Sequence, residues 1–421
     1  MLFIDIIIVL SAILSSLWIL LESFYYTRDK PPVPRTDGPR YKASIVVAIK
    51  NEDPEVVKGL VENLSRLDYP DYEVILVSDD SEQDFERLRQ IELPEKFKLV
   101  RRDVPQGRKA GALNYGVSLS TGEILVFLDA EARVDPTILT RISAHLSQAE
   151  AMALRLRVRD PKNKLQVLYS EITEFSMDSL FRGRYLKGLP VFPNGSAFAI
   201  RSSTLKRIGG WREGMVAEDL EIGMRLFLNG VKVGYADDVV VETLAPYTWK
   251  DLFQQMKRWA YGSGQLFPYS LSLLRRGMSG IEGAIYANQW GIYPAYFVML
   301  LIAGIVSPVF SSSLLSWVLS LTLFLISSLV FSWRSRTREY DLRIPALMIS
   351  AFLTGYLLGL LNAKFSWKVT PKVEREQGLW IPLESNIISY LFLLSGILAL
   401  KSYLVQGTIL LAISLILLII P

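Results

Sequence analysis

The chain has 421 residues, of which 50% are hydrophobic, and its mean hydropathy of +0.27 is too high for an ordinary soluble protein. A single histidine and the lack of cysteine exclude a histidine triad, disulfides, cysteine-ligated zinc and thiol catalysis. The net charge of +4 comes without a basic run interleaved with aromatics, so nucleic acid is not an expected partner. Part of the chain must therefore lie in lipid.

Residues 1–24 are predicted to form an N-terminal transmembrane anchor. Positions 2–22 are nearly all apolar, and about 20 such residues span a bilayer. A cleaved signal peptide is the alternative, but the stretch lacks a basic start and a small-residue cleavage site. The basic, proline-rich segment 27–42 is typical of a cytoplasmic flank, because short inner loops are rich in Lys and Arg. The N-terminus is therefore expected outside, with membrane lipids as partners.

Residues 41–250 have the mixed polar and apolar character of a water-soluble domain. Continuously apolar strands alternate with amphipathic helices, which indicates a doubly wound α/β layer with a mostly parallel sheet. Ligands of such sheets bind at the carboxyl ends of the strands. Acids stand at these ends in this chain. The predicted strands are ASIVVAIK, YEVILVSDD, FKLVRRD and GEILVFLDAE, and the predicted helices are EVVKGLVENLSRL and GRKAGALNYGVSLS.

The fourth predicted strand ends in two carboxylates one residue apart, Asp129 and Glu131. Because side-chain direction alternates along a strand, both are expected on the same side. Two like charges so close are costly unless a cation lies near them. Oxygen-only ligands suit Mg²⁺ or Mn²⁺, which bind through one or two carboxylates plus substrate phosphates. Taken alone, the pair is more typical of a capped turn and a solvated glutamate.

Three later segments carry further polar residues. PNGSAFAIR joins a Pro-Asn-Gly turn to a short strand. MVAEDLEIGMRLFLNG places Asp219 just before an amphipathic helix, so the alternative interpretation is that Asp219 is simply the N-cap of that helix. QQMKRWAYGSG puts Gln255, Arg258 and Trp259 on neighbouring helical positions. This last motif lies in residues 251–288, predicted as interfacial amphipathic helices, so a snorkelling arginine beside an anchoring tryptophan is the alternative interpretation.

In this order, the motifs resemble those of the membrane-integrated family 2 glycosyltransferases, which include cellulose, hyaluronan and chitin synthases and ceramide glucosyltransferase. The resemblance covers roughly residues 41–380 and implies a GT-A fold, a mixed, mostly parallel sheet with helices on both faces, combined with transmembrane helices. The family's metal motif is usually Asp-x-Asp, so Glu131 leaves the metal preference open. The motifs are Asp79-Asp80-Ser81, Lys109-Ala-Gly-Ala-Leu-Asn114, Asp129-Ala-Glu131, Asn194-Gly-Ser196, Glu218-Asp219 and Gln255-x-x-Arg258-Trp259.

The resemblance implies transfer of a hexose from a nucleotide-sugar donor, UDP- or GDP-hexose, to an acceptor hydroxyl. It assigns Asp79 to the nucleotide base, Lys109 to the nucleotide, and Asp129 and Glu131 to Mg²⁺ or Mn²⁺ on the diphosphate. It makes Asp219 the general base, which implies inversion and a β-linked product.

It also places the Gln255-x-x-Arg258-Trp259 motif at the substrates. Physical chemistry agrees with this assignment. A departing diphosphate develops charge that a divalent ion and Arg258 stabilise more in the transition state than in the ground state. The attacking hydroxyl must also lose its proton to a base. Trp259 would offer a flat apolar face to the acceptor.

Residues 289–421 are predicted to form a C-terminal membrane region with about four spans. Stretches 289–310 and 314–333 lead out and back, and the arginine-rich loop 333–343 after them is expected in the cytoplasm. Two final spans, near 384–401 and 404–420, return the C-terminus to the cytoplasm.

The stretch 344–363 is long enough to cross the membrane, but the segment after it argues against crossing. WKVTPK (367–372) is similar to the cytoplasmic gating loop of cellulose synthases, with Trp367 at the position of their Phe. A loop that covers the donor must lie on the donor's side. We therefore predict an interfacial or re-entrant helix at 344–363 and a gating-like loop at 364–380. The alternative is a further span with WKVTPK outside.

The sequence favours a processive β-polysaccharide synthase in the plasma membrane with a cytoplasmic catalytic domain, because of the Q-x-x-R-W motif and the WKVTPK loop. The alternative is a glycolipid synthase that adds one sugar to a lipid, since five predicted spans leave limited room for a polymer channel. A non-catalytic scaffold or transporter is disfavoured, because the spans hold few of the charged groups that transporters use. The acceptor is thus expected to be a polysaccharide or a lipid.

Overall fold

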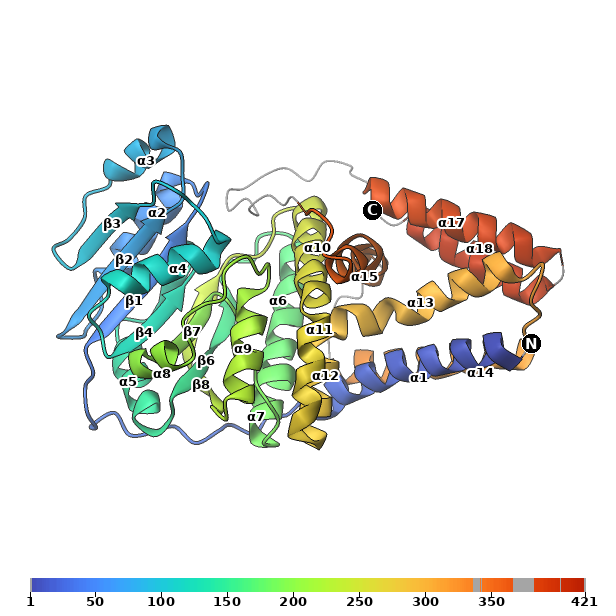
Figure 1. Ribbon diagram of the computed structural model, residues 1–421, viewed down its shortest axis with the longest axis horizontal. Coiled ribbons are helices and arrows are strands. Elements are labelled where there is room, and N and C mark those ends of the chain that lie inside the picture. Colours follow the sequence, from blue (N-terminus) through green and yellow to red (C-terminus); the bar gives the residue numbers. More distant parts are fainter. Residues whose placement is uncertain (1, 336–340, 342, 366–381, 402, 420–421) are drawn as a thin grey trace.

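The computed structural model describes residues 2–335, 341, 343–365, 382–401 and 403–419 (Figure 1). A sheet with its covering helices lies at one end of the molecule, and long apolar helices lie at the other. A column made of α10 (Trp249–Gln265), α11 (Phe267–Ser270) and α12 (Met278–Ala287) stands between them.

The sheet has eight strands among the described residues, in the order β3-β2-β1-β4-β7-β6-β8-β5. The first four are parallel to one another, β7 runs antiparallel to β4 and β6, and β6 is parallel to β8. The predicted mixed, mostly parallel sheet is therefore confirmed. The strands are β1 (Ala43–Ile49), β2 (Tyr72–Ser78), β3 (Phe97–Arg101), β4 (Ile124–Leu128), β5 (Arg133–Val134), β6 (Ala151–Val158), β7 (Ala197–Arg201) and β8 (Val233–Thr243).

Helices cover both faces of this sheet because each turns an apolar stripe toward it. Buried side chains of α2 and α5 pack on one face, and those of α4 and α9 pack on the other. The helices of this part are α2 (Pro54–Leu64), α3 (Glu82–Arg89), α4 (Arg108–Leu119), α5 (Ile138–Gln148), α6 (Lys164–Ser176), the π-helical η1 (Met177–Gly183), α7 (Arg184–Leu186), α8 (Ser202–Arg207) and α9 (Glu218–Leu228).

The register of the parallel strands determines which residues emerge together. Ile49 of β1 lies opposite Ser78 of β2, and Val47 of β1 lies opposite Leu128 of β4. The residues that come after β2 and β4 therefore leave the sheet at the same edge, which is where parallel sheets bind ligands.

At the opposite edge, Glu73 of β2 joins three segments. Its carboxylate accepts hydrogen bonds from the Ser44 hydroxyl (2.8 Å), from the Thr121 backbone N–H and hydroxyl (2.6 and 2.7 Å) and from Lys98 (3.2 Å). Burial alone would raise the pKa of Glu73, but the hydrogen bonds from Thr121, Ser44 and Lys98 outweigh it and lower the pKa to about 2.

Helix α12 is fixed to the part of the chain that contains the sheet by a buried ion pair. Arg184 of α7, fully buried, binds Glu282 of α12 and donates to the Pro190 carbonyl at 2.7 Å. Because breaking such a pair would leave a buried charge without compensation, it holds α12 in place. The 3₁₀ segment η2 (Leu271–Arg276) connects α11 to α12.

Five described segments are long and apolar enough to cross a membrane. Four match predicted spans: α1 (Leu2–Tyr25), α13 (Gln289–Val306), α14 (Leu314–Ser335) and α17 (Leu383–Leu400). The fifth, Arg343–Leu360, comprises α15 (Arg343–Ala351), the π-helical η3 (Phe352–Tyr356) and α16 (Leu357–Leu360). The predicted span near 404–420 forms α18 (Leu404–Ile419), which is shorter, at 16 residues.

The segment α15 is seen end-on in Figure 1, whereas α1, α13 and α17 are seen from the side. The chain beyond it packs on α10: the Tyr261 hydroxyl donates to the Ala363 carbonyl at 2.8 Å, and the rings of Tyr261 and Phe365 stack at 4.3 Å. Lys257 of α10 pairs with Glu384 at 3.0 Å. Apart from residues 364 and 365, the predicted gating-like loop lies outside the described residues.

Replacing Glu73 with Gln is expected to destabilise the part of the chain that contains the sheet by on the order of 2–3 kcal/mol at pH 7, because the lowered pKa of Glu73 reflects stabilisation of its charged form. A lowered pKa contributes stability above the ordinary value of 4.5, and this is lost as the pH falls toward about 2. Thermal unfolding of the detergent-purified chain from pH 7 to pH 2 measures it. Glu86→Gln, which removes an exposed pair with Arg89, is the control and should cost at most about 0.5 kcal/mol. Equal effects of the two variants would contradict the role given to Glu73.

Candidate active site

Lys109, at the start of α4, lies at the centre of a cluster of acids at the carboxyl edge of the sheet. Its Nζ atom is 2.7 Å from Asp129 Oδ1, 2.8 Å from the Gly195 carbonyl oxygen and 3.3 Å from Glu218 Oε1. These partners come from the end of β4, from the turn before β7 and from the first turn of α9. One ammonium thus joins three segments that are far apart in the sequence.

Asp219 enters the same cluster through Gly195. Its Oδ2 accepts the Gly195 backbone N–H at 2.8 Å, and its Oδ1 accepts the Leu220 N–H at 2.8 Å. A Cβ atom at position 195 would lie 3.1 Å from Asp219 Oδ2 and 3.3 Å from Lys109 Nζ, so a side chain there would crowd the cluster. The glycine of the Asn-Gly-Ser motif is explained by this close approach. The cap residue of α9 is Ala217, so Asp219 is not the N-cap.

Charges in the cluster affect one another strongly. Burial opposes the charge on Lys109, but Asp129 and then Glu218 outweigh it and raise the pKa of Lys109. Burial raises the pKa of Glu218, with Lys109 acting in the opposite direction. Burial also raises the pKa of Asp219, while Lys109 and the N–H groups of Leu220 and Gly195 lower it. Lys109 therefore stays charged, whereas Glu218 and Asp219 both ionise less readily than ordinary carboxyl groups.

Glu131 comes after β4 but is buried more deeply, at 3% exposure. β4 ends at Leu128, and the Ala132 N–H donates back to the Asp129 carbonyl at 3.0 Å in a turn. Burial lowers the pKa of the nearby Arg159, and the Glu131 carboxylate opposes that shift. The structure therefore places Glu131 beside Arg159, whose guanidinium also donates to the Glu131 carbonyl at 2.5 Å.

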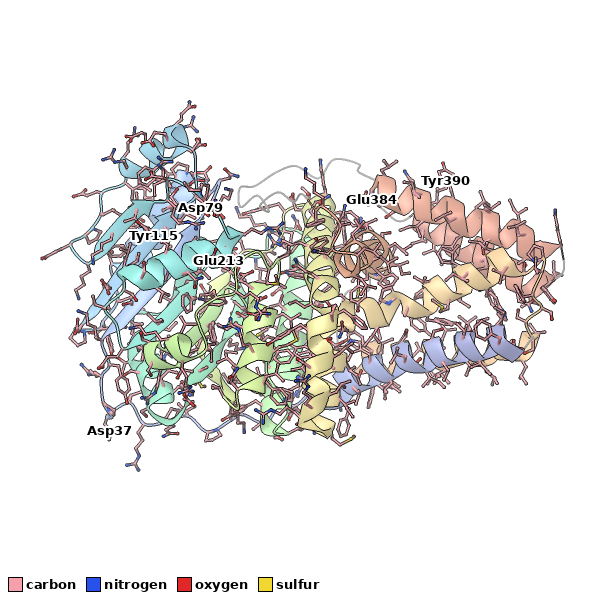
Figure 2. All side chains as sticks on the ribbon, viewed as in Figure 1. Asp37, Asp79, Tyr115, Glu213, Glu384 and Tyr390 are labelled. Carbon is pink, nitrogen blue, oxygen red and sulfur yellow. The ribbon has the colours of Figure 1, made fainter. Side chains whose placement is uncertain are left out.

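Asp79, just after the end of β2, forms a bidentate ion pair with Arg102, with N–O distances of 2.6 Å and 2.5 Å. Both side chains are largely buried. A cavity of about 460 Å³ lies next to this pair and is lined by Arg102, Asn114, Tyr115 and Glu213, among others. Figure 2 shows Asp79, Tyr115 and Glu213 around α4.

Gln255, Arg258 and Trp259 all lie on α10. Trp259 packs against Trp290 with ring centroids 5.4 Å apart, and Gln255 Oε1 is buried without a hydrogen-bond partner in the described part of the chain. Further along α10, a Cβ at Gly262 would lie 2.5 Å from Ala217 Cβ, and Gln265 accepts the Val216 N–H at 3.1 Å. The end of α10 therefore touches the residues just before Asp219.

The donor set at this edge suits a divalent cation that prefers oxygen. Asp129 is about one-third exposed and already binds a cationic group, the Lys109 ammonium. Asp129 together with the phosphate oxygens of a nucleotide would give the mostly oxygen coordination that Mg²⁺ and Mn²⁺ require. Among the residues that the structure describes, no group of three or more His, Cys, Asp or Glu side chains could hold a metal. Asp129 could therefore supply one carboxylate to such a cation, with its other ligands coming from phosphate oxygens.

Three contributors to the site have no role predicted from the sequence: Arg102, Glu218 and the backbone of Gly195. Arg102 lies near the end of the predicted strand FKLVRRD, but nothing in that strand indicates a partner that follows β2. Glu218 stands inside a recognised motif, and its raised pKa comes from burial. The one signal for Glu218 in the sequence is its position next to Asp219.

Comparisons with known proteins agree with this geometry. The sequence matches the family described as Glycosyltransferase like family 2 over residues 39–262. It is 28% identical over 396 residues to a probable glycosyltransferase of Sulfolobus acidocaldarius, covering 86% of this chain and 85% of the relative.

Two other relatives are matched over about half of their length. A beta-monoglucosyldiacylglycerol synthase of Synechocystis is 29% identical, with 57% of this chain and 52% of the relative covered. A poly-beta-1,6-N-acetyl-D-glucosamine synthase of Staphylococcus epidermidis is 26% identical, with 53% of this chain and 55% of the relative covered.

Among solved structures, a mannosyltransferase from Pyrobaculum calidifontis, in complex with GDP-Man and Mn²⁺, has a TM-score of 0.59 at 17% identity. The match includes 86% of this chain and 100% of the mannosyltransferase, which supports the GT-A fold. The family match spans more than half of the 421 residues. The chain is a glycosyltransferase that belongs to the Glycosyltransferase like family 2.

Proposed function

We propose that the chain moves a hexose with inversion from a nucleotide-sugar donor to an acceptor hydroxyl at a membrane surface. The observation that carries this proposal is the position of Asp219. It shares one cluster with Lys109 and Asp129, yet its carboxylate is fixed by Gly195 and Leu220 on the side of α9. One edge of the sheet can thus hold the leaving group at one end and the base at the other.

On the donor side, Lys109 would bind the diphosphate and Asp79 would contact the nucleotide base. A divalent cation bound at Asp129, with Glu131 as the second ligand implied by the resemblance, would neutralise charge on the departing diphosphate. Because Asp79 is paired with Arg102, we propose that this arginine fixes the orientation of its carboxylate. Arg258 would add positive charge from α10 as the donor bond breaks.

On the acceptor side, Asp219 would take the proton of the attacking hydroxyl. Two backbone N–H donors hold its carboxylate in a fixed orientation, and burial raises its pKa, which makes the charged form a stronger base. Trp259 and Gln255, on the helix that touches the start of α9, would position the acceptor.

We propose a lipid as the acceptor, so that one sugar is added at the bilayer surface. The diacylglycerol-glucoside synthases among the relatives support this, at 29% and 30% identity. The position of α10 between the sheet and the apolar helices also supports it, because an acceptor in the bilayer would reach Asp219 along this helix.

A processive polysaccharide synthase, which the sequence favours, is the second candidate. Its support is the polysaccharide synthase among the relatives, at 26% identity, and the Q-x-x-R-W motif. The two candidates share the same chemistry at the donor and differ in the acceptor and in whether the product stays to be extended.

For the membrane we propose the orientation with the catalytic part in the cytoplasm and the N-terminus outside. The basic segment 27–42 beyond α1 supports this orientation. We also propose that residues 343–360 lie at the interface on the cytoplasmic side, since α15 is seen end-on while the other apolar helices are seen side-on.

Asp219→Asn is expected to lower the transfer rate by at least about 100-fold while leaving donor binding nearly unchanged, because it removes the base but not the diphosphate contacts. In the wild type, a raised pKa means that kcat/KM falls as the pH drops through a value above that of an ordinary aspartate. Initial rates from pH 4 to pH 9 measure both effects. Asp68→Asn, at an exposed site, is the control. Full activity of Asp219→Asn would contradict the proposed base.

Products made by the detergent-purified chain with Mn²⁺ and UDP-glucose, UDP-N-acetylglucosamine or GDP-mannose distinguish the two acceptor classes. With added membrane lipid, we expect one organic-extractable glycolipid carrying a single sugar. A ladder of water-soluble oligosaccharides in place of that species would support the processive synthase. If the wild-type protein gives neither product with any of the donors, while a known transferase run in parallel gives its product, both candidate functions are contradicted.

Single cysteines test the orientation cleanly, because the chain has none of its own. Asp37→Cys lies in the exposed segment after α1, and Val309→Cys lies in the connection between α13 and α14, where Val309 is 79% exposed. In intact cells, an impermeant maleimide should label position 309 and spare position 37, and both should react after lysis. Labelling of position 37 alone in intact cells would invert the proposed orientation.

A further inference from the structure

A cavity of about 360 Å³ lies where α1 and α14 end, next to the catalytic part. Tyr26, Thr27 and Arg28 just beyond α1 line it on one side, and Trp333 and Arg334 in the last turn of α14 line it on the other. The helices α1 and α14 pack along each other, so both leave the apolar region at this level. None of the five lining residues belongs to the candidate active site.

Two guanidinium groups face this cavity without forming an ion pair to any described residue. Arg334 donates to the Ser23 and Tyr26 carbonyls at 3.4 and 3.2 Å, which are neutral groups. Arg28 is exposed. The side chain of Arg28 hydrogen-bonds to that of Tyr26, and Asp178, an acid whose charge also acts on Arg28, is already paired with two other arginines. Two of the five side chains that line the cavity are thus positively charged and none is acidic, and the Asp29 carboxylate hydrogen-bonds to Thr27 at 3.2 Å beside them.

The walls of the cavity are held in place by the folded domain. The ring of Tyr26 stacks on Phe175 at 5.3 Å, and the guanidinium of Arg334 lies 5.6 Å from the centroid of the Tyr26 ring. The Thr27 carbonyl accepts a hydrogen bond from Arg182 Nη1 at 3.2 Å. The site is thus partly organised before a ligand arrives, which lowers the entropic cost of binding.

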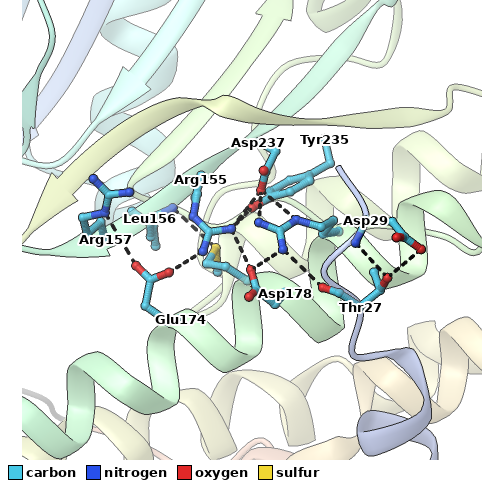
Figure 3. Close-up of polar contacts among 11 residues, drawn as sticks. Thr27, Asp29, Arg155, Leu156, Arg157, Glu174, Asp178, Tyr235 and Asp237 are labelled. Carbon is cyan, nitrogen blue, oxygen red and sulfur yellow. Dashed lines mark hydrogen bonds and ion pairs between the residues drawn. The ribbon is translucent and has the colours of Figure 1, made fainter. Parts of the chain in front are cut away.

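Figure 3 shows how this wall is connected to the sheet. Arg182 binds Asp178 at 2.9 Å and Asp237 of β8 at 2.8 Å, and Arg155 of β6 binds the same two acids at 2.8 Å. The segment after α1 is therefore fastened to two strands of the catalytic sheet through a largely buried network of charges.

The position of the cavity along the apolar helices indicates where its ligand comes from. Trp333 is 75% exposed and adjoins Arg334 at the end of a candidate span, the combination found at the headgroup level of membranes. Guanidinium groups match phosphate oxygens in geometry as well as in charge. A phosphate carried by a lipid would reach both arginines while its acyl chains remain beside α14.

We propose that this cavity binds the phosphate headgroup of an anionic phospholipid from the leaflet on the catalytic side. Arg28 and Arg334 donate to the phosphate oxygens, and Trp333 covers the glycerol and the start of the acyl chains. The bound lipid ties the end of α1 to the end of α14, and through Thr27 and Arg182 it supports the catalytic sheet. This site is separate from that of the acceptor and does not depend on the proposed function.

Native mass spectrometry of the full-length chain in non-ionic detergent tests this proposal, with phosphatidylglycerol as the probe. Phosphatidylcholine with the same acyl chains tests for general lipid adhesion, and sn-glycerol 3-phosphate tests for a site that takes a free phosphate. Arg28→Gln should weaken phosphatidylglycerol binding about fivefold, since one arginine near the surface contributes about that much. Arg28→Gln with Arg334→Lys keeps the charge at position 334 but removes the planar guanidinium, so it should weaken binding further than Arg28→Gln alone.

The matched control is Arg275→Gln, at an exposed arginine on η2 that lies outside the cavity. We expect one phosphatidylglycerol to bind more tightly than phosphatidylcholine, and Arg275→Gln to leave that preference unchanged. Equal binding of the two lipids, an equal loss in Arg275→Gln, or binding of glycerol phosphate as tight as that of the lipid would each overturn the proposal. Because Arg28 is exposed, its variant should fold, and unchanged thermal unfolding in phosphatidylcholine confirms that.

Discussion

The ammonium of Lys109 is the interaction on which the candidate site depends. It brings together Asp129, Glu218 and the Gly195 carbonyl, which belong to three segments between residues 129 and 218. Acids crowded at a partly buried edge repel one another and would be costly without a cation. The Lys109 ammonium at the start of α4 makes the arrangement possible. An incoming phosphate group would meet this positive charge already held in place by its neighbours.

A second constraint comes from the membrane side. Helix α10 carries the Q-x-x-R-W motif, and its close approach at Gly262 to Ala217 places that helix against the start of α9. The buried pair of Arg184 and Glu282 keeps α12 in a fixed position relative to the sheet. The proposed base, Asp219, is therefore held between the sheet and helix α10, along which an acceptor from the membrane would arrive.

Much of this arrangement could be predicted from the sequence, because continuous apolar runs that end in acids specify parallel strands and the edge at which those acids lie. The turn after β4 could not. The expectation that Asp129 and Glu131 project to one side rests on strand alternation, whereas β4 ends at Leu128 and a turn comes next, so the direction of Glu131 depends on that turn. The partners Arg102 and Glu218 depend on contacts between distant segments, which one sequence does not contain. Hydropathy also cannot give the orientation of residues 343–360, since it reports composition only.

The most direct test of the proposed chemistry is an experimental structure of the chain with a non-hydrolysable nucleotide sugar and Mn²⁺, with the metal located by anomalous scattering. We expect that Mn²⁺ lies against Asp129, that Lys109 contacts the diphosphate, and that Asp219 faces the anomeric carbon from the opposite side. Donor density away from the cluster of Lys109, Asp129 and Asp219, or a metal bound elsewhere, would contradict the proposed site.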